Sequence, residues 1–137
     1  MGFARSSKRS LPVALFVLAS SVLLSGCVRG VAIDIDGPIG APVFLLKSGM
    51  MWKVGAPPCF THIQVMAGVE RLWSLSAPRC VVLSKLDYGV APPGFRETAP
   101  AKPLAAGGVY AISASGYGWT GQRRFSDDGR VHRLLKN

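Results

Sequence analysis

Apolar and polar residues alternate with a period of two along several short stretches of this chain, which is the pattern of strands with one buried face. The clearest case is residues 31–36, where three β-branched residues alternate with an alanine and two aspartates before Gly37-Pro38. A glycine followed by a proline marks a turn and ends such a strand. After the N-terminal apolar run, no stretch keeps the 3.6-residue period of a helix, so strands are expected throughout.

Short apolar segments separated by Gly and Pro clusters extend this pattern along the chain. Further strands are predicted over residues 43–47, 52–54, 60–66, 71–75, 80–86, 109–115, 122–126 and 131–135. Residues 67–70 and 127–130 are predicted hairpin turns, and the proline-containing stretch 89–108 is the longest break. About seven or eight short strands predict an all-β domain, either a small antiparallel sandwich that is immunoglobulin-like by analogy or a small barrel.

The first 26 residues are expected to be a targeting segment rather than part of the fold. Arg5, Lys8 and Arg9 precede an uncharged, mostly apolar run over residues 11–24. As a helix this run would span about 21 Å, which is short of the roughly 30 Å hydrocarbon core of a bilayer. A basic head before a short apolar run is typical of a signal peptide.

The run ends in Leu24-Ser25-Gly26-Cys27, which resembles the lipobox of bacterial lipoproteins. The resemblance implies that Leu24, Ser25 and Gly26 are the recognition positions and that Cys27 becomes the N-terminus. It also implies a diacylglycerol on the Cys27 sulfur and an acyl chain on its new amine, with no other cofactor expected. The alternatives are an ordinary secretory cleavage, an uncleaved anchor, and N-myristoylation at residues 1–6.

The same resemblance sets the expected location and domain organisation. Inner-membrane lipoproteins often carry Asp after the lipidated Cys, whereas this chain has Val28, which implies the outer membrane of the bacterial envelope, facing the periplasm. Two or more acyl chains give stable anchoring. The expected division is a signal peptide over residues 1–26, a lipidated tether over 27–30 and a β domain over 31–137.

The chain is basic, with 16 Lys+Arg against 7 Asp+Glu among its 137 residues and a formal net charge of +9. The basic residues are scattered until the C-terminal stretch 123–136, and export places the domain away from the genome. Both facts argue against a nucleic-acid partner. The expected partners are the membrane, through the lipid anchor, and a cell-wall polymer or a protein attracted to the basic surface.

Cys59 and Cys80 remain once Cys27 is lipidated, and two cysteines in an oxidising compartment are predicted to form a disulfide. In the chain-entropy model, closing this loop stabilises the fold by about 3.4 kcal/mol. Two alternatives use His62 as well: a reactive Cys59 thiol with His62 as its base, or a metal site, which lacks a fourth ligand.

A glycine-rich stretch over residues 115–121 contains two aromatic residues, Tyr117 and Trp119, and is followed by Arg123 and Arg124. Rigid aromatic side chains supply contact area to partners, so these four residues are the candidate partner-binding residues. The alternative is a tight turn whose aromatic side chains fold back on the core.

The motifs of known chemistry are missing from the sequence. There is no Gly-x-Ser-x-Gly elbow, no phosphate loop and no paired carboxylates at a suggestive spacing. We therefore expect a lipid-anchored, non-enzymatic binding module. The alternatives are an inhibitor or immunity-type lipoprotein that blocks a lytic enzyme, and a structural accessory of an envelope assembly.

Overall fold

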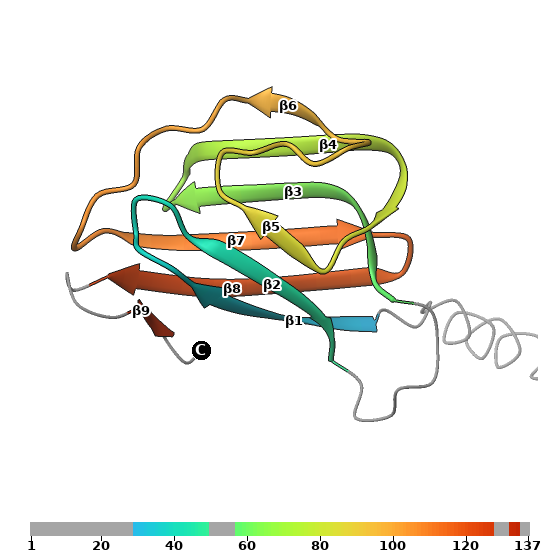
Figure 1. Ribbon diagram of the computed structural model, residues 1–137, viewed down its shortest axis with the longest axis horizontal. Helices are drawn as coiled ribbons and strands as arrows, with labels where there is room; N and C mark the ends of the chain where they lie inside the picture. The colour runs from blue at the N-terminus through green and yellow to red at the C-terminus, as the bar shows by residue number, and fades with distance from the viewer. Residues whose placement is uncertain (1–28, 50–56, 128–131, 135–137) are drawn as a thin grey trace, which may run out of the picture.

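The computed structural model describes residues 29–49, 57–127 and 132–134, and within these residues all regular structure is strand. The alternating segments of the sequence form these strands because each buries one face, as the pattern predicts. The strands are β1 (Arg29–Asp36), β2 (Val43–Ser48), β3 (Cys59–Ala67), β4 (Glu70–Val82), β5 (Lys85–Asp87), β6 (Arg96–Ala99), β7 (Val109–Gly116), β8 (Trp119–Asp127) and β9 (His132–Leu134) (Figure 1).

The strands belong to one curled sheet in the order β5-β2-β1-β8-β7-β3-β4-β6, an open half-barrel, and β9 pairs with the far end of β8. The predicted all-β class with one disulfide is confirmed. The expected antiparallel pairing holds at every seam but one, because β1 runs parallel to β8 through Arg29–Trp119 and Gly30–Thr120. Gly121 permits this crossing, since a Cβ there would lie 2.5 Å from the Val31 carbonyl oxygen.

The core lies inside the curl. Phe44 of β2 meets Phe125 of β8 edge-on with ring centres 5.6 Å apart, so the curl brings together the two strands that flank β1. Trp73 of β4 is fully buried and packs against Tyr88, which follows β5. Each fully buried apolar side chain of this size contributes about 1.5–3 kcal/mol. Other core residues are Val31, Ile33, Leu46, Phe60, Ile63, Val65, Leu75, Leu86, Tyr110, Ile112, Ala114 and Trp119.

Several predicted boundaries differ from the structure. The predicted strand over residues 80–86 is divided between the end of β4 and β5, and β4 continues through Pro78. Pro78 is tolerated because the β3–β4 register shifts there: His62 pairs with Ser76, but Phe60 pairs with Val81. The predicted break over 89–108 contains β6. The predicted strand over 52–54 lies outside the described residues, as does most of the predicted turn over 127–130.

Cys59 and Cys80 form the predicted disulfide, with their Cα atoms 5.2 Å apart. The bond joins the first residue of β3 to the third-last residue of β4, beside the register shift. Because each sulfur is bonded to the other, neither is a free thiol or a metal ligand, so the two alternatives built on Cys59, His62 and Cys80 are not formed.

Candidate functional site

The outer face of β4, β3, β7 and β8 carries polar side chains in register across four strands. We call the first set the His62 row and the second the Gln64 row. The His62 row consists of Ser76, His62, Ser115 and Thr120, and the Gln64 row consists of Ser74, Gln64, Ser113 and Gln122. Each member is the cross-strand partner of the next, so hydroxyl, amide and imidazole groups form two continuous lines across the sheet.

These rows face outward because the residues between them face the core. On β3, Ile63 and Val65 are buried on the inner face and leave His62 and Gln64 on the outer one. On β7, the buried Ala114 has the same role between Ser113 and Ser115. The period of two in each strand and the register between strands thus produce the polar surface together.

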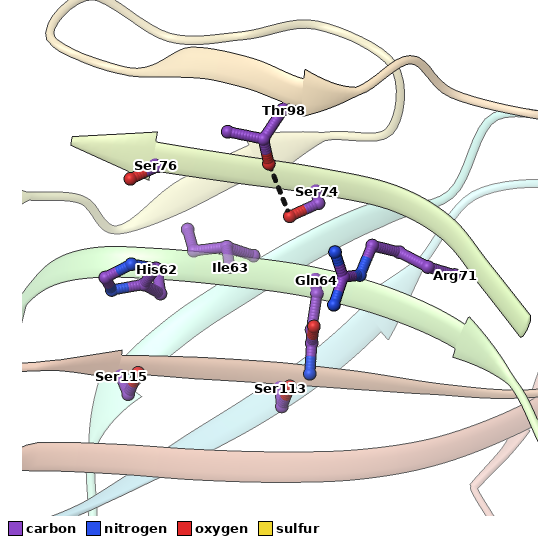
Figure 2. Close-up of a pocket in the computed structure, with 9 residues that line it drawn as sticks. All are labelled: His62, Ile63, Gln64, Arg71, Ser74, Ser76, Thr98, Ser113 and Ser115. Atoms are coloured by element: carbon purple, nitrogen blue, oxygen red, sulfur yellow. Dashed lines mark hydrogen bonds between the residues drawn. The ribbon is translucent and has the colours of Figure 1, made fainter. Parts of the chain in front are cut away.

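A third set of cross-strand partners follows the Gln64 row, and we call it the arginine row: Arg71, Met66, Ala111 and Arg124. Two adjoining depressions of about 400 and 510 Å³ cover this part of the sheet and share Gln64 and Ser113. Figure 2 shows the Arg71 guanidinium reaching back over the sheet toward Gln64 and Ser74. Among the described residues that line either depression, none is acidic.

Strand β6 closes one side of the polar surface. The Thr98 hydroxyl donates to the Ser74 hydroxyl oxygen at 2.7 Å, which explains how Ser74 is satisfied while nearly buried (Figure 2). The carboxylate of Glu97 is turned to the other side, where it accepts a hydrogen bond of 2.9 Å from the Trp73 indole. The acidic side chain of β6 is therefore not among the groups that line the depression.

His62 is exposed within its row, between Ser76 and Ser115, with Nδ1 3.1 Å from the Thr61 hydroxyl oxygen. The Thr61 hydroxyl also lies 3.5 Å from the Ser115 carbonyl oxygen, so a short polar chain joins β3 to β7. This arrangement orients the imidazole over the sheet beside serine hydroxyls, where it offers one more donor or acceptor to a ligand.

The glycine-rich stretch forms the β7–β8 turn. Gly118 has φ +75°, a left-handed conformation that glycine adopts readily. Tyr117 at the tip is 71% exposed, but Trp119 is only 6% exposed and lies beneath the Arg29 guanidinium. Tyr117 is therefore accessible and stays a candidate for partner binding, whereas Trp119 is covered where β1 meets β8 and is not available to a partner.

The two predicted arginines point to opposite faces of β8. Arg124 is exposed and belongs to the arginine row, whereas Arg123 is half-buried on the inner side. The Arg123 Nε is covered and has no hydrogen-bond partner among the described residues. Of the four predicted binding residues, the structure therefore places only Arg124 on the polar surface.

The expected signal peptide, the lipobox and Cys27 lie outside the described residues. Within the described residues, no helix is long and apolar enough to cross a membrane. A search of known protein families, curated proteins and solved structures returns nothing that matches this chain.

Sequence reasoning missed the polar surface, although each strand carried its signal. Serine occupies alternate positions at 74 and 76 and again at 113 and 115, and His62 and Gln64 alternate with apolar residues in the same way. The signal is weak within one strand because a solvated face has the same pattern. The surface offers many neutral donors and acceptors flanked by two guanidinium groups, which suits a ligand rich in hydroxyl and amide groups and bearing negative charge.

Proposed function

We propose that this protein is a lipid-anchored, non-enzymatic binding module of the bacterial envelope that holds the cell-wall polymer against the outer face of β4, β3, β7 and β8. The anchor is the lipid expected on Cys27, and the outer membrane, on its periplasmic side, is the proposed location. The observation that carries the proposal is the register of the His62 row, the Gln64 row and the arginine row on one uncovered face.

The chemistry of peptidoglycan supports this choice of ligand. Its glycan strands present hydroxyl and acetamido groups at regular intervals, and its peptide stems carry carboxylates. The neutral rows supply matching donors and acceptors, and Arg71 and Arg124 supply charge-assisted hydrogen bonds to carboxylates. An extended polymer is also able to follow a row across several strands.

The composition of the surface favours this ligand over an inhibited enzyme. Protein interfaces draw most of their binding energy from Trp, Tyr and Arg in desolvated pockets. The His62 and Gln64 rows contain no Trp, Tyr or Phe. The depression over both rows is lined mainly by polar side chains. Such a surface forms many weak contacts along a polymer rather than a few strong ones at a point.

The test is co-sedimentation with purified peptidoglycan sacculi at low and high salt. One variant combines Arg71→Gln and Arg124→Gln. The matched control combines Lys47→Gln and Lys85→Gln, which removes the same charge from exposed positions on β2 and β5. We expect wild type and control to sediment with sacculi and the arginine variant to lose binding several-fold, with binding weaker at high salt.

Two outcomes would contradict the proposal. The first is that the wild-type protein stays in the supernatant at low salt. The second is that the two double variants lose binding equally, which would mean that net charge, rather than the arginine row, is responsible. A Gln64→Ala variant separates the contribution of the neutral rows to binding from that of the arginines. We expect this variant to bind sacculi less tightly, with the same dependence on salt as the wild type.

A further inference from the structure

Arg29, the residue at which the described domain begins, lies at the same end of the domain as the β7–β8 turn. The sheet begins at Arg29, two residues before the expected domain start, and the Arg29 N–H donates to the Gly118 carbonyl oxygen at 2.7 Å. Successive Cα atoms are about 3.8 Å apart, so covalent geometry keeps the Cα of Cys27 within about 8 Å of that of Arg29. A lipid on Cys27 therefore enters the membrane beside this turn.

The side chains at this end suit a membrane interface. Tyr117, at the tip of the turn, is 71% exposed, although Trp119 beside it is covered. Gly116 packs against the backbone of Cys59, whose cross-strand partner Val82 is 59% exposed. Tyrosine is enriched at bilayer interfaces because its ring is apolar and its hydroxyl remains at the level of the headgroups.

Acidic residues are distributed unequally along the strands, whereas arginines occur at both ends. Arg29 lies at this end, Arg79 adjoins the disulfide, and Arg96 pairs with Ser76 of the His62 row. Apart from Glu97, which is bonded to Trp73, the acidic residues of the described strands lie toward the other end of the sheet. They are Asp34, Asp36, Glu70, Asp87 and Asp127.

We propose that the end of the domain formed by the β7–β8 turn rests on the membrane that holds the Cys27 lipid, with Tyr117 at headgroup level and Arg29, Arg79 and Arg96 facing anionic headgroups. This inference rests on the lipid anchor of the proposed function. The domain is then held by a short linkage to the lipid and by a second, non-covalent contact, because anionic lipid surfaces attract basic side chains.

The docked orientation keeps the binding surface free. The start of β1 and the β7–β8 turn lie at one end of the ribbon, and the β3–β4 turn lies at the opposite end (Figure 1). Strands β7 and β8 then run away from the membrane, with the His62 row nearest to it and the arginine row farther out. The outer face stands sideways to the bilayer and is open to a polymer in the periplasm.

The test compares two spin-labelled positions in the full-length lipoprotein reconstituted in vesicles of phosphatidylcholine and phosphatidylglycerol. Tyr117→Cys carries the label at the proposed interface. Val69→Cys is the matched control, because Val69 is fully exposed in the β3–β4 turn at the opposite end. Collision rates with a water-soluble nickel complex and with oxygen report whether each label is in water or in lipid.

We expect the label at position 117 to collide several-fold less often with the nickel complex, and more often with oxygen, than the label at position 69. In vesicles of phosphatidylcholine alone, the difference should shrink. Equal accessibility of both labels would overturn the inference, and equal protection in both vesicles would overturn the role of the arginines. The intact mass of the same sample distinguishes failure of the docking from failure of the anchor. If Cys27 carries the lipid but the label at position 117 is accessible to water, only the docking is refuted. If Cys27 carries no lipid, the anchor and the docking are both refuted.

Discussion

The Arg29 guanidinium lies 5.2 Å from the centre of the Trp119 ring, at the point where β1 joins β8. A cation over an aromatic face contributes about 0.5–1 kcal/mol at an exposed site. Its larger consequence is structural, since Arg29 covers a ring that the sequence would place in a binding loop. Trp119 is therefore part of the seam that closes the sheet, and Tyr117 two residues earlier is the exposed aromatic residue of the turn.

Replacing these two aromatic residues should give opposite results. Trp119→Ala should lower the free energy of unfolding by about 3–5 kcal/mol, because it removes a large side chain from the core. Tyr117→Ala should change it by less than about 0.5 kcal/mol, because the side chain is exposed. Urea unfolding of both variants measures the difference. If Trp119→Ala hardly lowers the free energy of unfolding, Trp119 does not belong to the core where β1 pairs with β8.

The hydrogen bond between Trp73 and Glu97 should stabilise the edge strand β6. Glu97→Ala leaves the indole N–H of the fully buried Trp73 without this acceptor, which should cost about 1–3 kcal/mol. Glu97→Gln is the matched control, because its amide oxygen still accepts the bond and the cost should be smaller. If both variants lose the same free energy of unfolding in denaturant, the stabilisation comes from the negative charge of Glu97 rather than from its hydrogen bond to the indole.

Tyr88 should make the fold sensitive to alkaline pH. Burial raises the pKa of Tyr88 to about 12 from an ordinary 10.0, and the neighbouring Tyr110 adds to the rise. The folded state then holds this proton more tightly than the unfolded state. Its stability contribution is complete below about pH 10 and is lost as the pH rises toward about 12.

Thermal unfolding between these pH values, for wild type and Tyr88→Phe, measures the effect. The wild type should lose stability more steeply than the variant over this range. Tyrosinate absorbance gives an independent value for the pKa. Parallel curves for the two proteins would show that Tyr88 titrates normally.

The disulfide should account for a substantial part of the stability. Replacing both Cys59 and Cys80 by Ser should lower the free energy of unfolding by about 3 kcal/mol, because the open chain regains loop entropy. Non-reducing and reducing mass spectrometry of the envelope-purified protein first establishes that the bond is present. A double variant as stable as wild type would show that the register shift between β3 and β4 holds without the bond.

The sequence predicts most strands because alternation is a local property. Val31 and Ile33 are buried as the period of two requires, although Ile35 is only half-buried where β1 approaches its end. Pro78 is the main misleading signal, since it indicates a strand end but lies in a register shift within β4. The parallel seam between β1 and β8 depends on contacts between distant segments, which no local pattern contains.

The candidate site was less predictable than the fold. Tyr117 and Trp119 have the same kind of local sequence, but Tyr117 lies in the turn, whereas Trp119 begins β8 and belongs to the core. Ser74 and Gln64 belong to one row solely because β3 and β4 pair in that register. A surface made of cross-strand neighbours is invisible in the sequence, whereas the resemblance to a lipobox rests on four consecutive residues.

Intact-mass analysis of the protein purified from envelopes tests the central claim, an anchored domain that begins at a lipidated cysteine. We predict a polypeptide that starts at Cys27, carries the mass of a diacylglycerol and an amide-linked acyl chain, and loses membrane partitioning or processing in a Cys27→Ser variant. A polypeptide that starts at any other residue, or one that starts at Cys27 without added hydrocarbon, would contradict the account.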